Sequence, residues 1–228
     1  MKYELILFDA DGTLFDYDKA ERYALEQTCR QHGLGYDQPL LERYRAINSS
    51  LWRQLEEGMI TSSKIRVERF RRLLSEIGSD AECNWEEFAQ HYLSHLAGGA
   101  WLIDGAEEIC RYLAPYYKLA ILTNGIKEVQ ISRFQASPLT PYINKLIISE
   151  EVGYSKPRPE IFEYAMKTLG QECRSTTMIV GDSLTSDMRG GKDFGIATCW
   201  YNPHGIENGT GLEVDYEIRR LDQLKDIL

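Results

Sequence analysis

The sequence of 228 residues lacks long apolar runs and an excess of positive charge. No apolar segment approaches the roughly 18 residues that a membrane-spanning helix needs, and the mean hydropathy is −0.39, so we predict no membrane segment and no membrane partner. Lys and Arg number 26 against 35 Asp and Glu, which gives a net charge of −9. Because phosphate backbones attract basic surfaces, this balance excludes a general binder of nucleic-acid polymers.

Paired metal-binding motifs and a secretory leader are lacking as well. His91 and His95 stand four residues apart, but no Glu lies between them as a zinc-protease motif requires. The N-terminus runs directly into an apolar strand without a secretory h-region, so we expect a cytoplasmic protein. The five cysteines are far apart and form no Cys-x-x-Cys pair, which favours reduced packing thiols: Cys29, Cys83, Cys110, Cys173 and Cys199.

The sequence does contain a repeated pattern of short apolar runs that end in polar turns. Continuous apolar strands are typical of a sheet that is covered on both faces, and helical patterns separate them, for example around Phe162 and Met166. We therefore predict an α/β fold with a Rossmann-like doubly wound parallel sheet, whose ligands bind beyond the carboxyl ends of the strands. The predicted strands cover residues 4–8, 118–122, 146–148, 178–180 and 197–201.

One long stretch, residues 17–97, interrupts this alternation and shows only helical patterns. In the clearest of these helical patterns, apolar residues recur at spacings of three and four. At the start of another helical pattern, Asn84 and Glu87 form a capping pair. We predict an α/β core domain of residues 1–16 and 98–228 and an inserted helical-bundle cap domain of residues 17–97. Because both crossings lie near strand ends, we expect the cap to be a lid over the active face, with a purely structural bundle as the alternative.

Polar residues collect at the predicted strand ends. Asp9 and Asp11 follow the first strand, Thr123 the second, and Asp182 with Asp187 the fourth, while Lys156 precedes a helix. A lone Asp-x-Asp is also compatible with an Asx-turn. Four separate positions with suitable polar groups instead favour a shared site at one edge of the sheet.

The segment Asp9-Ala10-Asp11-Gly12-Thr13-Leu14 resembles the signature of the haloacid dehalogenase superfamily. The resemblance extends to Thr123 before Asn124-Gly125, to Lys156 before Pro157, and to Gly181-Asp182 with Asp187. It implies a phosphomonoester hydrolase with a helical cap on a core typical of that superfamily. The catalytic residues that it implies are Asp9, Asp11, Thr123 and Lys156.

The resemblance also implies a role for each of these residues. Asp9 is the nucleophile that forms an aspartyl phosphate, and because an anionic carboxylate needs a cation to approach a phosphate, a bound Mg²⁺ is implied. Asp11 is the general acid and then the base, and relatives that cleave carbon–halogen bonds lack it. Phosphoryl oxygens are bound by the Thr123 hydroxyl, the Lys156 ammonium and the main-chain N–H groups around Asn124 and Gly125. The implied metal ligands are Asp9, Asp11 through its main-chain carbonyl, Asp182 and Asp187.

Further segments are similar to the housekeeping 5'-nucleotidase branch of this superfamily, whose members hydrolyse chiefly pyrimidine nucleoside monophosphates. These segments are residues 46–52, 57–62, 148–153 and 197–202, although Gly12 stands where some branch members carry Glu. We expect a small phosphorylated metabolite as partner, contacted in the cap by Asn48, Trp52 and Arg69. Trp52 is also compatible with cap packing. The alternatives are a sugar-phosphate or phosphoglycolate phosphatase, a phosphosugar mutase and a non-catalytic binding module.

Overall fold

The computed structural model describes residues 2–79 and 83–228. Contacts divide the chain into two compact units. The core unit comprises Met1–Tyr17 and Ala100–Leu228, and the helical unit comprises Asp18–Gly99. The division lies slightly later in the chain than the boundaries at 16/17 and 97/98 that we expected.

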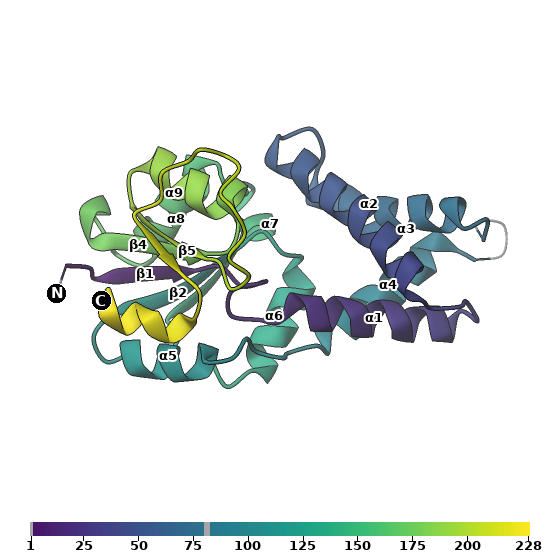
Figure 1. The fold of residues 1–228 in the computed structure, drawn as a ribbon, viewed down its shortest axis with the longest axis horizontal. Helices are drawn as coiled ribbons and strands as arrows, with labels where there is room; N and C mark the ends of the chain where they lie inside the picture. The colour runs from purple at the N-terminus through teal and green to yellow at the C-terminus, as the bar shows by residue number, and fades with distance from the viewer. Residues whose placement is uncertain (1, 80–82) are drawn as a thin grey trace. The chain divides into compact units, whose positions relative to one another are not determined.

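The core unit is built on a sheet in which every neighbouring pair of strands is parallel (Figure 1). The strand order is β3-β2-β1-β4-β5-β6, so β1 lies between β2 and β4. This confirms the predicted α/β fold. The strands are β1 (Leu5–Phe8), β2 (Lys118–Thr123), β3 (Lys145–Ile148), β4 (Thr177–Gly181), β5 (Ala197–Tyr201) and β6 (Tyr216–Ile218).

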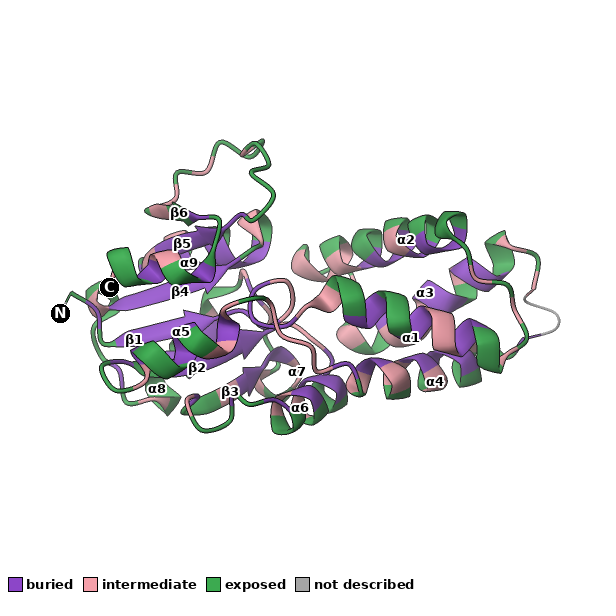
Figure 2. Cartoon of the chain, turned by 60° about the horizontal axis from the view of Figure 1, so that its bottom comes forward, coloured by how far each residue is buried: buried purple, intermediate pink, exposed green. Residues whose placement is uncertain are grey.

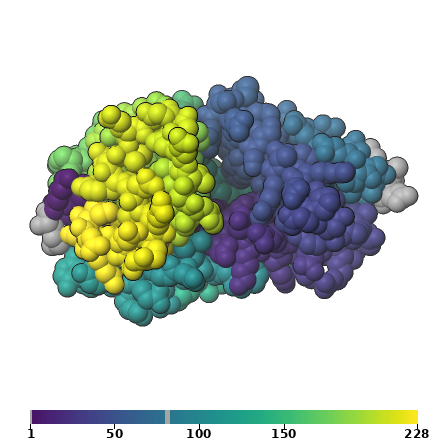
Figure 3. All heavy atoms as spheres, in the orientation of Figure 1, coloured from purple at the N-terminus to yellow at the C-terminus, as the bar shows by residue number. Residues whose placement is uncertain are grey.

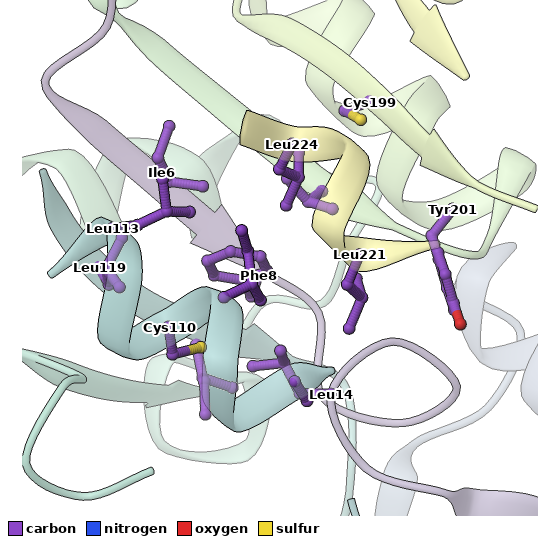
Figure 4. Packing of buried hydrophobic residues seen from close by; sticks show 14 of the residues in the cluster. Ile6, Phe8, Leu14, Cys110, Leu113, Leu119, Cys199, Tyr201, Leu221 and Leu224 are labelled. Atoms are coloured by element: carbon purple, nitrogen blue, oxygen red, sulfur yellow. The ribbon is translucent and has the colours of Figure 1, made fainter. Parts of the chain in front are cut away.

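One face of the sheet is covered by α5 (Ala106–Leu113) and by the C-terminal 3-10 helix η3 (Leu221–Asp226). Side chains from both elements meet Ile6 and Phe8 of the central strand (Figure 4). In the space-filling view the C-terminal residues form a continuous surface over the core unit (Figure 3). These contacts remove Ile6 and Phe8 from solvent completely.

The opposite face packs on α8 (Pro159–Thr168) and α9 (Arg189–Phe194). Leu5 and Leu7 point to this face, because successive strand residues alternate sides. Both faces of the central strands are therefore buried, as the burial colours show (Figure 2). This explains why these strands are apolar at every position rather than at every second one.

Four further elements lie between the strands of the core unit. Two of them are helices that follow β2 and β3 on the side of the candidate site, and a π-helical turn follows β4. They are α6 (Lys127–Ala136), α7 (Ser149–Val152), the 3-10 turn η1 (Arg174–Thr176) and the π-helical turn η2 (Leu184–Met188).

The helical unit contains helices and, within residues 18–79 and 83–99, no strand. Its centre is aromatic: the Tyr44 and Phe70 rings stack at 5.6 Å, and Tyr92 lies 4.8 Å from Phe70. The Asn84 side chain accepts the Glu87 N–H at 3.2 Å and so begins the last helix, as the capping pattern predicts. The helices are α1 (Tyr17–Gln31), α2 (Gln38–Glu56), α3 (Ser62–Glu76) and α4 (Trp85–Ala97).

Four of the five cysteines are packing residues, as predicted, whereas Cys173 is exposed. All five thiols are free and four are buried. Burial raises the pKa of Cys29, Cys110 and Cys199 to about 12, so these thiols stay protonated at neutral pH. None of the described helices combines the length and the apolarity needed to cross a bilayer.

Candidate active site

The predicted site residues meet at the carboxyl edge of the sheet because of the strand register. Phe8 lies beside Ile121 of β2 on one side and Val180 of β4 on the other. The residues that follow these positions, among them Asp9 and Asp182, therefore leave neighbouring strands at the same edge. Both of these residues belong to the core unit.

Lys156 is a buried cation between two carboxylates. Its Nζ lies 2.5 Å from Asp9 Oδ1 and 2.6 Å from Asp187 Oδ1, and it also donates to the Leu122 carbonyl at 2.7 Å. Burial by itself lowers the pKa of Lys156, but the charges of Asp187 and Asp9 raise it above its ordinary value. The ammonium therefore stays charged and holds the two carboxylates together.

Negative charge exceeds positive charge at this edge. Oxygen atoms of Asp9, Asp182 and Asp187 all lie within 4.8 Å of one another, against the single ammonium of Lys156. Burial raises the pKa of Asp9 to about 7, with Asp187 and Asp11 adding to the effect and Lys156 opposing it. A divalent cation would relieve this repulsion, and carboxylate oxygens are the ligands that Mg²⁺ prefers. The donor set therefore fits Mg²⁺.

The loop after β4 is fixed by residues that the sequence did not identify. The Ser183 N–H donates to Asp187 Oδ2 at 3.1 Å, and the Trp200 indole N–H donates to the Asp182 carbonyl at 2.9 Å. A Cβ atom at Gly181 would lie 2.3 Å from Asp187 Oδ2, so only glycine allows this close approach. The Ser183 N–H and the space at Gly181 thus position the Asp187 side chain, and the Trp200 indole positions the main chain at Asp182.

Thr123 ends β2 and Asn124 follows it, as expected, but their polar atoms make different contacts. The Gly125 N–H donates to Thr123 Oγ1 at 3.0 Å, which leaves the hydroxyl proton available to an acceptor. Asn124 Oδ1 accepts the Lys156 N–H at 2.8 Å, and Asn124 Nδ2 donates to the Lys156 carbonyl at 2.9 Å. The Asn124 side chain therefore positions Lys156, and the Gly125 N–H that we assigned to the phosphoryl group is directed to Thr123.

Asp11 is held by two residues of α6 that the sequence analysis missed. Gln130 Nε2 donates to Asp11 Oδ2 at 2.6 Å, and Arg133 Nη1 donates to Asp11 Oδ1 at 2.5 Å. The only sequence signal was their spacing of three, which places both on one helix face. Polar residues on a helix usually face solvent, so residue type did not mark Gln130 and Arg133 as site residues.

The expected cap residues lie inside the helical unit. Arg69 is 1% exposed, and its Nη1 donates to Asn48 Oδ1 at 3.4 Å and to the Tyr44 hydroxyl at 3.2 Å. Its guanidinium lies 4.8 Å from the centre of the Tyr92 ring. Trp52, one turn after Asn48 on α2, is half-buried.

Known proteins with similar sequences and structures match this chain over its whole length. A family model described as haloacid dehalogenase-like hydrolase matches residues 3–195. The chain is 36% identical over 229 residues to the pyrimidine 5'-nucleotidase PynA of Streptococcus pneumoniae, covering 100% of this chain and 96% of that protein. It is 31% identical over 228 residues to the pyrimidine 5'-nucleotidase YjjG of Escherichia coli, covering 100% of this chain and 99% of that protein. The crystal structure of the HAD-hydrolase YfnB of Bacillus subtilis, bound to magnesium, superposes with a TM-score of 0.93 at 36% identity, covering 100% of this chain and 99% of that chain.

Proposed function

This chain belongs to the haloacid dehalogenase-like hydrolase family, and we propose that it is an Mg²⁺-dependent hydrolase of pyrimidine nucleoside 5'-monophosphates that acts through an aspartyl phosphate. The observation that carries the proposal is the placement of Asp9 against the buried Lys156 ammonium and beside two further carboxylates, with Asp11 two residues further along the chain. The names of the relatives PynA and YjjG support the substrate class. The intact catalytic set argues against a non-catalytic binding module.

In the proposed reaction the Asp9 carboxylate attacks phosphorus, and the bond from phosphorus to the leaving oxygen breaks. Asp11 gives its proton to that oxygen, so that the nucleoside leaves as a neutral alcohol. Water then attacks the phosphorus of the aspartyl phosphate and gives a proton to Asp11, which releases inorganic phosphate and restores Asp9. Each proton that Asp11 gives is therefore returned within one turnover.

The remaining residues stabilise charge during these steps. Lys156 keeps a fixed positive charge beside Asp9, and the Thr123 hydroxyl, whose oxygen accepts the Gly125 N–H, would donate its proton to a phosphoryl oxygen. Mg²⁺, held by Asp9, Asp182, Asp187 and the Asp11 carbonyl, would supply the charge that lets an anionic nucleophile approach an anionic phosphate. Recognition of the leaving group is proposed for side chains of the helical unit, with Asn48, Trp52 and Arg69 as the first candidates.

The test is phosphate release from a panel of nucleoside monophosphates and sugar phosphates, with Mg²⁺ and after its removal by a chelator. We expect turnover that requires Mg²⁺ and favours uridine and thymidine 5'-monophosphates. A consistent preference for sugar phosphates or phosphoglycolate over every nucleotide would overturn the substrate assignment. An isomerised sugar phosphate with a bisphosphorylated intermediate would replace the hydrolase with a mutase.

A further inference from the structure

We propose that Gln130 and Arg133 are positioning residues that hold the Asp11 carboxylate in the orientation required for proton transfer with the leaving group. This inference rests on the proposed function, because it assigns a purpose to Asp11 in that reaction. It adds two residues of α6 to the site, and neither of them would touch the substrate.

The contacts occupy both oxygens of the carboxylate. Gln130 Nε2 reaches Oδ2 at 2.6 Å and Arg133 Nη1 reaches Oδ1 at 2.5 Å. Two bonds to two oxygens fix the plane of the carboxylate, whereas one bond would let it rotate. Each carboxylate oxygen has a second lone pair, so Asp11 can still carry or accept a proton while both bonds are present.

The three side chains differ in exposure in a way that suits this role. Gln130 is 2% exposed and the Arg133 side chain is fully buried, but 25% of the Asp11 side chain remains accessible. The two donors are therefore shielded from competing water, and the carboxylate presents one edge to solvent. A proton donor must be accessible to the leaving group, whereas the residues that hold it in place can be buried.

The surrounding chain is shaped to admit the two donors. A Cβ atom at Gly125 would lie 2.1 Å from Gln130 Nε2 and would clash with it. Glycine in the turn after β2 therefore provides the space that the Gln130 side chain occupies. The Arg133 guanidinium lies 4.8 Å from the centre of the Phe15 ring, and Phe15 closes the turn that carries Asp11 by donating its N–H to the Ala10 carbonyl at 2.8 Å. The same arginine thus contacts both the carboxylate and the turn that supports it.

Positioning of this kind has a measurable consequence. General acid–base catalysis contributes about 10²–10⁴-fold to a rate, and a misplacement of about 1 Å can cost about 10²-fold. The loss will depend on the leaving group. A ribose 5'-hydroxyl needs a proton as it departs, whereas p-nitrophenolate is stable as an anion and does not.

The experiment compares kcat/KM for uridine 5'-monophosphate and for p-nitrophenyl phosphate in the wild type and in Q130M and R133K. Methionine keeps the volume of glutamine without its donor, and lysine keeps the charge of arginine without its planar fork. We expect Q130M to lose about tenfold or more with the nucleotide and less than about threefold with p-nitrophenyl phosphate. R133K should show the same selective loss to a smaller degree, and it provides a second test if Q130M does not fold.

Gln171 supplies a matched control. It is also buried, and its Nε2 donates to a carboxylate, Glu4 Oε2, at 3.0 Å, but it lies at the opposite end of β1 from the site. Q171M should lower stability without changing the ratio of the two kcat/KM values. In a D11N background the selective effect of Q130M should disappear, because the group that it positions is already lost.

Three results would count against the inference. An equal fall with both substrates would show that Gln130 and Arg133 only support the fold. Unchanged kinetics in folded Q130M or R133K would show that Asp11 needs no such support, and a selective loss that persists in D11N would show that the two residues act elsewhere. If the wild type hydrolyses neither substrate, the proposed function itself fails together with this inference.

Discussion

Asn124 uses both polar atoms of its amide on the main chain of Lys156, which makes it a link between the end of β2 and the buried cation. Residue types alone could predict that Asn124 lies at a strand end. They could not predict its partner, because Lys156 is 32 residues away and meets it only in the folded sheet. Asp9 and Asp182 were easier to predict, since each directly follows an apolar strand.

The first prediction concerns this link. N124A should destabilise the protein by about 1–2 kcal/mol through two lost hydrogen bonds and should lower kcat by about tenfold or more, because Lys156 is no longer held beside Asp9. The measurements are thermal unfolding and phosphate release. N144A is the control: Asn144 Oδ1 also accepts a main-chain N–H, that of Leu119 at 2.9 Å, at the far end of the sheet. N144A should lower stability without lowering kcat. An equal loss of kcat in N124A and N144A would contradict the role given to Asn124.

The second prediction concerns the three carboxylates. Mg²⁺ should raise the melting temperature of the wild type, because binding to the folded state adds about 2.7 kcal/mol at a concentration of 100 times Kd. D182N removes one ligand and one repelling charge, so its melting temperature without Mg²⁺ should be equal or higher while the Mg²⁺-induced rise becomes small. Differential scanning calorimetry over a Mg²⁺ series measures both melting temperatures.

The control for this prediction is D222N, which changes an exposed acid of the C-terminal helix and should keep the wild-type rise. An undiminished rise in D182N would place the metal elsewhere.

At the scale of elements, apolar patterning predicted the strands that are buried on both faces and missed the edge strand β6. Tyr216–Ile218 is too short for a pattern, and its central residue, Glu217, is exposed. The π-helical turn Leu184–Met188, in which Asp187 packs closely on Gly181, was also not predicted. Helix positions were predictable, but the polar residues of α6 that face the site were not.

A third prediction concerns α3 in the helical unit. Hydrogen bonds from Arg71 and Arg72, at 2.7 and 2.8 Å, lower the pKa of Glu68 to about 2 against the opposing effect of burial. A carboxyl whose pKa is lower in the folded state stabilises the fold above its unfolded pKa and loses this contribution as the pH falls toward the folded value. Because both arginines reach solvent, we expect E68Q to cost only about 1 kcal/mol at pH 7.

The measurement for Glu68 is the urea midpoint of E68Q and wild type across a pH series. The difference should be constant from pH 7 to about 5 and should narrow steadily toward pH 3, because glutamine imitates the protonated acid. E42Q is a suitable control, since Glu42 accepts a hydrogen bond from the neutral Gln38 side chain at 2.9 Å and makes no ion pair within the described part of the chain. A difference that grows as the pH falls would refute the assigned direction of the shift.

At the scale of the whole molecule, the net charge of −9 is informative about function. A protein with this balance cannot attract an anionic substrate through its overall field, so it needs local cations. Lys156 is such a cation. Several of the acidic residues in excess are the carboxylates that would bind a second cation, Mg²⁺. The same composition that excludes nucleic-acid polymers therefore suits one small phosphate at one site.

The fourth prediction is that the core unit folds alone. The Asp16 N–H donates to the Trp101 carbonyl at 2.9 Å, so the chain leaves and re-enters the core at neighbouring points. Replacing residues 18–99 with a short Gly/Ser linker should leave a folded protein that is still stabilised by Mg²⁺. It should also discriminate less between uridine 5'-monophosphate and ribose 5-phosphate, if the helical unit recognises the leaving group. Circular dichroism with a Mg²⁺ series tests the first point, and an unfolded product would contradict it.

The most direct test of the whole account is the rate of phosphate release from uridine 5'-monophosphate with Mg²⁺ by wild type and by D9N. Asparagine has nearly the shape of aspartate but is a poor nucleophile, so D9N should remain folded and lose at least about a thousandfold in rate. Circular dichroism at matched concentration checks the fold. Folded D9N that releases phosphate at a rate close to that of the wild type would contradict the assignment of Asp9 as the nucleophile.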